Sequence, residues 1–164
     1  MLERERKGSC AQSATVATES KPVYLDTAIL VKLLVREPDS AYYATLVDRR
    51  IVWSSTVLVT ECYSALLRKE REGSITAGHR RAAWRQVEAD VAAARIALVP
   101  VERELLERAN AILESTHPSV ALRSLDAIHV ASAEACRSWP LCSNDARVRA
   151  AASLLGMQLT PLPP

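Results

Sequence analysis

Residues 23–34 read VYLDTAILVKLL, and this stretch decides the fold. The apolar run Val23-Tyr24-Leu25 predicts a short buried strand, and the apolar positions that follow Thr27 predict a helix. Asp26 stands between the two. In an α/β chain, the carboxyl end of a strand lies at the edge of the sheet where such folds bind ligands. Asp26 is therefore the first candidate site residue.

The same alternation of strand and helix continues to the end of the chain. It implies parallel β-α-β units with right-handed crossovers. We predict a three-layer α/β/α domain over residues 22–164, with about five parallel strands in the order 3-2-1-4-5 and helices on both faces. The predicted strands are 22–26, 51–53, 96–101, 141–143 and 157–159. The predicted helices are 27–36, 39–50, 54–72, 75–95, 102–114, 124–137 and 145–155, with Gly73 and Gly156 as stop signals.

Composition places the chain among ordinary globular proteins. It has 164 residues, 49% hydrophobic and 24% charged, with a net charge of only +2, so bulk charge does not indicate nucleic-acid binding. Residues 1–21 lack the apolar core of a signal peptide, and no apolar run is long enough to span a membrane. We expect residues 1–21 to form a flexible extension. The four cysteines form no C-x-x-C pair, which favours unpaired thiols in a reducing cytoplasm.

Three further acids stand in similar contexts: Glu61, Asp126 and Asp145. Asp145 follows a predicted strand as Asp26 does. For Asp26, Asp126 and Asp145 an ordinary role at a helix start, as a cap or a first-turn acid, is the alternative. Glu61 instead falls on the apolar stripe of its helix, where an ionised carboxylate is costly unless it is paired or binds a metal. A position at the edge of that stripe, or an ion pair with an Arg, is the alternative for Glu61.

A strand order of 3-2-1-4-5 would place Asp26 and Asp145 at one crevice, with Glu61 and Asp126 beside them. Crowded carboxylates repel each other, and this raises their pKa values. Mg²⁺ or Mn²⁺ relieves the repulsion, because these hard ions prefer oxygen ligands. Such a site suits hydrolysis of phosphodiesters by a metal-activated water.

The chain resembles PIN-domain ribonucleases, and is most similar to the VapC-type toxins of bacterial toxin–antitoxin pairs. The resemblance covers residues 22 to about 160. Its matching segments are VYLDTA at 23–28, residues 54–67 around Glu61, LRSLDAIHVASA at 122–133 and LCSNDARVRAAASLL at 141–155. The extension before the first strand departs from the family, whose chains typically begin within a few residues of that strand.

The resemblance implies both a site and partners. It assigns Asp26, Glu61, Asp126 and Asp145 as catalytic ligands of Mg²⁺ or Mn²⁺. Thr27 and Ser143 match supporting positions of the family, and Asn144 lies beside them. The implied activity is hydrolysis of RNA. The implied partners are an RNA substrate, a cognate antitoxin and a second copy in a homodimer.

Basic residues suggest where RNA would lie. Lys32 and Arg36 follow Asp26 on one predicted helix, and Arg68 and Lys69 open the most basic segment, residues 67–85. A rim that contacts phosphates is one interpretation. An ordinary solvated helix face is the alternative. His129, three residues after Asp126, is expected to be structural rather than a general base.

Two other functions remain open at this point. The first is a phosphatase or phosphotransfer domain with Asp26 as nucleophile. Ala28 stands where haloacid-dehalogenase-like phosphatases need a second Asp, which argues against that class. The second is a non-enzymatic binding module of the same fold, whose acids serve only as caps.

Overall fold

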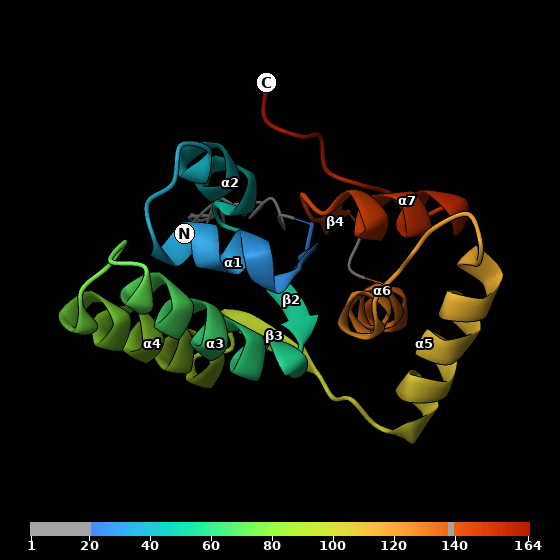
Figure 1. Cartoon of the computed structure of the whole chain (residues 1–164), viewed down its shortest axis with the longest axis horizontal. Helices are drawn as coiled ribbons and strands as arrows, with labels where there is room; N and C mark the ends of the chain where they lie inside the picture. Colours follow the sequence, from blue (N-terminus) through green and yellow to red (C-terminus); the bar gives the residue numbers. More distant parts are fainter. Residues whose placement is uncertain (1–20, 138–139) are drawn as a thin grey trace, which may run out of the picture.

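The structure is a computed structural model that describes residues 21–137 and 140–164. Its helices and strands alternate along the chain (Figure 1). The strands are β1 (Val23–Leu25), β2 (Val52–Ser55), β3 (Ile96–Val99) and β4 (Leu141–Cys142). The helices are α1 (Thr27–Leu34), α2 (Ser40–Val47), α3 (Val57–Arg71), α4 (Ala77–Ala92), α5 (Arg103–Thr116), α6 (Ser124–Cys136) and α7 (Ala146–Leu154).

The strands form one parallel sheet in the order β3-β2-β1-β4. Tyr24 pairs with Trp53 of β2 on one side and with Leu141 of β4 on the other. β1 is therefore the central switch point, from which the chain builds outward in both directions. The predicted parallel sheet and its strand order are confirmed for these four strands.

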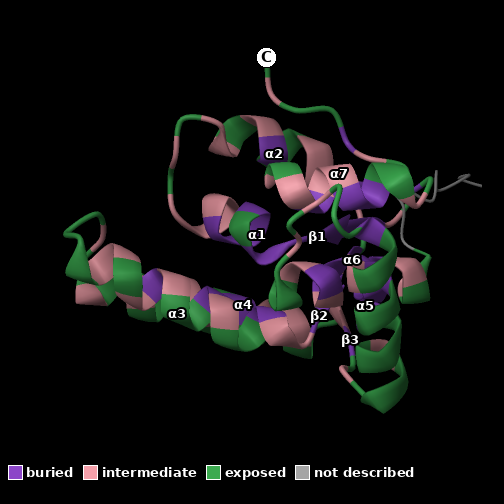
Figure 2. Cartoon of the chain, turned by 45° about the vertical axis from the view of Figure 1, so that its right-hand side comes forward, coloured by how far each residue is buried: buried purple, intermediate pink, exposed green. Residues whose placement is uncertain are grey.

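Helices cover both faces of the sheet, because β1 alternates its side chains between them. Val23 and Leu25 pack with α1, α2, α3 and α4 in one buried cluster. Tyr24 points to the opposite face and packs with α5, α6 and α7 in a second cluster. Figure 2 shows β1 buried between these layers, while α5 keeps a largely exposed outer surface. The predicted three-layer architecture is confirmed.

The predicted fifth strand, 157–159, is reduced to a single bridge. Leu159 pairs in parallel with Leu141 through two backbone hydrogen bonds: the Leu141 N–H donates to Gln158 O, and the Thr160 N–H donates to Leu141 O. It therefore lies beside β4, where a fifth strand would lie, but it is too short to form one.

Short polar residues in the sequence predict helix caps at Ser54 or Ser55, at Ser124, and at Asn144 or Ser143. These predictions are wrong by one or two residues. Ser54 and Ser55 belong to β2, and the cap position of α3 is Thr56. The cap positions of α6 and α7 are Arg123 and Asp145.

The predicted stop signals are correct, and both glycines adopt a left-handed conformation. Gly73 has φ 74° after α3, and Gly156 has φ 71° after α7. Side chains rarely adopt this left-handed conformation. The expected N-terminal extension lies outside the described residues, except for Lys21.

Candidate active site

The candidate site lies where β1 and β4 end side by side. Asp26 follows β1 directly, and its backbone N–H donates to the carbonyl oxygen of Cys142 across 3.1 Å. Asp145 follows Cys142 by three residues. The two acids stand at the starts of α1 and α7, so both lie at the carboxyl edge of the sheet beside its switch point.

Asp26 is buried and partly satisfied by its own helix. Only 5% of the residue is exposed, and its Oδ1 accepts a hydrogen bond from the Ile29 N–H at 3.0 Å. Burial raises the pKa of Asp26 above its ordinary value, and the nearby charge of Asp145 raises it further. A hydrogen bond from Ser143 lowers the pKa but does not cancel the rise. Asp26 therefore does cap α1. Its carboxylate is nevertheless buried, and a cation would stabilise the charged form.

Glu61 reaches the site from α3 and receives two hydrogen bonds on one oxygen. Thr27 Oγ1 donates to Glu61 Oε2 at 2.5 Å, and His129 Nε2 lies 2.7 Å from the same oxygen. Burial raises the pKa of Glu61, but these hydrogen bonds outweigh it, so the pKa lies below its ordinary value. The partner is thus a His and a Thr rather than the Arg considered from the sequence.

Asp126 and Asp145 share a guanidinium. Arg147 Nη2 lies 3.2 Å from Asp145 Oδ2, and Arg147 Nε lies 3.8 Å from Asp126 Oδ2. Both acids also serve helix starts: Asp145 accepts from the N–H groups of Arg147 and Val148, and Asp126 accepts from the N–H of Arg123. Partial burial raises the pKa of Asp145, but its hydrogen bonds outweigh this and lower it.

These directions correct one expectation. Crowding was expected to raise the carboxylate pKa values, and this is wrong for Glu61 and Asp145, whose pKa values are lowered. Each of those two carboxylates has a hydrogen-bond donor of its own, which favours the charged form. Only Asp26 follows the expected direction, mainly because it is buried.

The predicted supporting residues hold the acids from the side. Thr27 binds Glu61, as described above. Ser143 Oγ accepts from the Asp145 backbone N–H at 3.1 Å, and it also hydrogen bonds to Asp26. Asn144 is exposed and lines the groove in front of the site.

The oxygen donors suit a hard divalent ion, yet they are not arranged around one. Among the described residues, no group of three or more His, Cys, Asp or Glu side chains has the arrangement of a metal site. The reason is local: Arg147 lies against Asp126 and Asp145, while His129 and Thr27 occupy one oxygen of Glu61. Arg147 Nε is buried and has no hydrogen-bond partner among the described residues, so the guanidinium is incompletely satisfied there.

Arg147 and Tyr24 were missed from the sequence. Arg147 follows Asp145 by two residues, a spacing that could have identified it as a counter-ion. Tyr24 gave no signal, because a strand residue between two apolar neighbours looks like ordinary core. Its hydroxyl lies 2.9 Å from Nδ1 of His129, from which it is separated by 105 positions.

A groove of about 650 Å³ opens in front of the site, between α1 and α3. Its lining includes Glu61 and Asn144, together with Lys32, Arg68 and Lys69 of the predicted RNA contacts. Arg36 is exposed but does not line this groove. Three of the four predicted contacts therefore share one surface.

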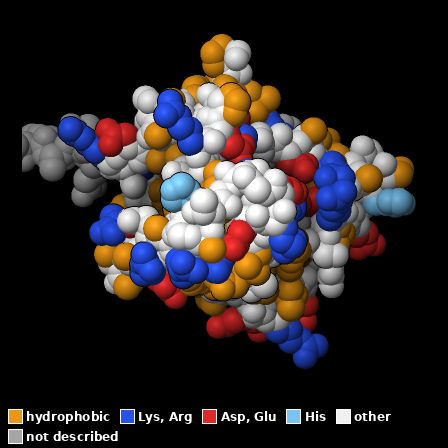
Figure 3. All heavy atoms as spheres, turned by 60° about the vertical axis from the view of Figure 1, so that its left-hand side comes forward, with side chains coloured by type: hydrophobic (Ala, Val, Ile, Leu, Met, Phe, Trp, Pro, Cys, Tyr) orange, Lys and Arg blue, Asp and Glu red, His pale blue; other side chains and the backbone are white. Residues whose placement is uncertain are grey.

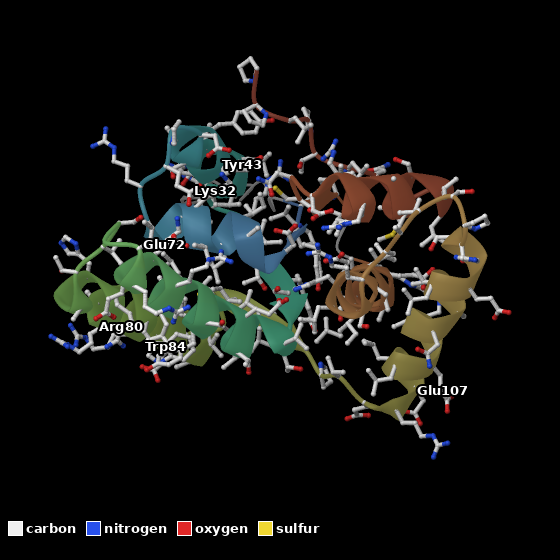
Figure 4. All side chains as sticks on the ribbon, viewed as in Figure 1. Lys32, Tyr43, Glu72, Arg80, Trp84 and Glu107 are labelled. Carbon is white, nitrogen blue, oxygen red and sulfur yellow. The ribbon has the colours of Figure 1, made fainter. Side chains whose placement is uncertain are left out.

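Two of those cations are already paired. Lys32 Nζ, at the junction of α1 and α2 (Figure 4), lies 2.8 Å from Glu37 and 2.9 Å from Asp39. Lys69 Nζ lies 2.6 Å from the other oxygen of Glu37. Arg68 is more available, because its side chain is 62% exposed and its contact with Glu72 is 4.0 Å long.

The wider basic segment is not a uniform basic surface. Arg80 pairs with Glu70 across the α3–α4 turn. On the face shown in Figure 3, Lys and Arg side chains are interspersed with Asp and Glu.

Comparison with known proteins agrees with this architecture. The PIN domain family model matches residues 23–154. The chain is 37% identical over 138 residues to Ribonuclease VapC46 of Mycobacterium tuberculosis, covering 82% of this chain and 93% of that protein. The chain belongs to the VapC-type PIN-domain family.

Solved structures of PIN proteins share the fold. The structure of Mycobacterium tuberculosis VapC20, described as a toxin that cleaves the sarcin-ricin loop, superposes with a TM-score of 0.62 at 19% identity. The match covers 79% of this PIN chain and 94% of VapC20. Rickettsia felis VapBC2, solved with a DNA fragment from its promoter, gives a TM-score of 0.53 at 14% identity, covering 78% of this chain and 91% of that one.

Proposed function

We propose that this chain is a Mg²⁺- or Mn²⁺-dependent endoribonuclease and the toxin of a toxin–antitoxin pair. The observation that carries the proposal is the pair Asp26 and Asp145, which lie at the carboxyl edge of a PIN-type sheet beside its switch point. Glu61 is linked to this pair through Thr27, the neighbour of Asp26, and Asp126 is linked to it through Arg147. The relative with 37% identity is a ribonuclease, which supports the reaction.

The four carboxylates would hold the ion through oxygen ligands, as hard divalent ions prefer. When bound, such an ion lowers the pKa of a water and neutralises charge on the phosphoryl oxygens. Thr27 and Ser143 orient Glu61 and Asp145 through their hydroxyl groups. Arg147 balances the charge of Asp126 and Asp145 in the protein without metal.

The groove gives the RNA a place to lie. Arg68 presents an exposed guanidinium at its rim, and Asn144 presents an amide beside the acids. Phosphate contacts of this kind position a substrate without reading its sequence. Lys69 would join them once Glu37 is displaced, and Lys32 once both Glu37 and Asp39 are displaced.

The proposed partners follow the family. They are an RNA substrate, an antitoxin protein and a second copy of this chain. The α3–α4 pair offers a surface for a second copy, because Val59 and Tyr63 of α3 are 37% and 38% exposed. No helix among the described residues is long and apolar enough to cross a membrane. A cytoplasmic location belongs to the proposal, and the buried thiols of Cys62 and Cys142 are compatible with it.

A map of cleavage sites on total cellular RNA tests the proposal. We expect defined new RNA ends in Mg²⁺ or Mn²⁺, and none in EDTA or with the Asp26→Asn variant. Cleavage that survives both EDTA and Asp26→Asn would overturn the metal-dependent mechanism. The map also names the substrate.

A non-enzymatic binding module is the second candidate, because Asp26, Asp126 and Asp145 do serve helix starts. It predicts RNA binding without new RNA ends in any metal. An Asp-nucleophile phosphatase is less well supported, since the residue two positions after Asp26 is the exposed Ala28.

A further inference from the structure

A buried chain of hydrogen bonds leads from the core of the sheet to Glu61. Tyr24 Oη lies 2.9 Å from His129 Nδ1, and His129 Nε2 lies 2.7 Å from Glu61 Oε2. Tyr24 is completely buried and His129 is 4% exposed. A polar chain in such a position must be matched donor to acceptor, since an unmatched buried group costs free energy.

The distances match donor to acceptor along the whole chain when His129 carries its proton on Nε2. Nε2–H then donates to the Glu61 carboxylate, with Thr27 Oγ1 3.2 Å away, and the Tyr24 hydroxyl donates to Nδ1.

The chain also decides which oxygen of Glu61 is occupied. Thr27 and His129 both bind Oε2, and no hydrogen bond to Oε1 is found among the described residues. Glu61 lines the groove, and its side chain is 25% exposed. Without its two partners, a glutamate on the groove wall would sample several rotamers.

We propose that Tyr24 and His129 are positioning residues that hold Glu61 through Oε2 and leave Oε1 available to a metal ion. Tyr24 acts by fixing the Nε2–H tautomer of His129, and His129 acts by holding the carboxylate. The inference rests on the proposed function of the same site. Partners that orient metal ligands in this way typically contribute 10- to 100-fold to metal affinity.

The first test measures Mn²⁺ affinity of the full chain by calorimetry. Tyr24→Phe removes one hydroxyl and keeps the ring, and we expect it to weaken Mn²⁺ binding by about 10-fold or more. His129→Ala is expected to weaken it further, and His129→Gln to restore part of the loss by returning an N–H donor. Thr116→Val is the matched control: it removes a buried hydroxyl that bonds to the backbone carbonyls of Ile112 and Leu113 in its own helix, α5. It should leave Mn²⁺ affinity unchanged.

The second test reads the tautomer directly, and its deciding measurement is made on the wild-type protein. Long-range ¹H–¹⁵N spectra of the wild-type imidazole should show His129 protonated at Nε2 and bare at Nδ1. Tyr24→Phe should give a mixture of tautomers. A wild-type His129 protonated at Nδ1 overturns the inference, even if Tyr24→Phe does not fold.

The outcomes separate this inference from the function it rests on. Wild-type protein that neither binds Mn²⁺ nor cleaves RNA in its presence overturns both. Wild-type protein that does both, while Tyr24→Phe and His129→Ala bind Mn²⁺ as tightly as the wild type, overturns only the positioning role.

Discussion

Asp26 performs two tasks with one carboxyl group. Its Oδ1 caps α1 through the Ile29 N–H, and this task survives in Asp26→Asn because the amide oxygen also accepts. Burial already penalises the charge of Asp26, as its raised pKa shows. We therefore expect Asp26→Asn to abolish metal-dependent cleavage and to change the free energy of unfolding of the metal-free protein by less than about 1 kcal/mol, in either direction.

Urea unfolding at pH 7 checks this expectation, with Asp26→Ala as the comparison. The alanine loses the cap and should cost about 0.5–2 kcal/mol more than the asparagine. Equal destabilisation by both substitutions would mean that the negative charge itself holds the fold.

Glu61 should behave in the opposite way. Repulsion among four acids would make Glu61→Gln stabilising, but the lowered pKa of Glu61 shows that its charge is favoured in the folded chain. Glu61→Gln weakens the hydrogen bonds from Thr27 and His129, and we expect a loss of about 1–3 kcal/mol in the free energy of unfolding without metal. Glu72→Gln, at the exposed end of α3, should change it by less than about 0.5 kcal/mol. Chemical denaturation of both variants at pH 7 decides between repulsion and pairing.

At the scale of elements, Glu37 ties the α1–α2 turn to α3. Its carboxylate accepts from Lys32 of α1 and Lys69 of α3. Burial raises the pKa of Glu37, but the two lysines outweigh it and lower the pKa below its ordinary value of 4.5. A lowered folded-state pKa stabilises the fold fully above the unfolded-state pKa, and this contribution is lost as the pH falls through the folded-state pKa.

Glu37→Gln should therefore destabilise the protein most near pH 7. The difference from the wild type should shrink as the pH falls below about 4.5, the ordinary value. Urea unfolding at pH 7, 5 and 3.5 measures the difference, and Glu88→Gln on the exposed side of α4 is the control. A difference that stays constant with pH would show that the glutamine acts through packing instead.

At the scale of the molecule, the sequence predicted the layers of the fold, but not the side-chain contacts between residues of different layers. The alternation at Val23, Tyr24 and Leu25 sends side chains to both faces, and that pattern alone indicates helices on both sides of the sheet. The contact of His129 with Glu61 joins positions 68 apart, on two helices that belong to buried clusters on opposite faces of the sheet. No local pattern encodes such a meeting. For the same reason the sequence placed four acids at one edge but did not reveal that Arg147 lies between two of them.

The whole molecule should report metal binding through its stability. The four proposed ligands lie before α1, in α3, in α6 and before α7, so only the folded chain could offer them to one ion. A ligand that binds the folded state alone adds about 2.7 kcal/mol at 100 times its Kd. For a domain of this size we expect Mn²⁺ to raise Tm by roughly 5–10 °C. Differential scanning calorimetry in Mn²⁺, in EDTA and in K⁺ at equal ionic strength measures the shift.

Asp145→Asn keeps an oxygen to cap α7 but removes one charge, so its shift should be much smaller. An equal shift in Asp145→Asn, or in K⁺, would place the effect of Mn²⁺ elsewhere on the surface.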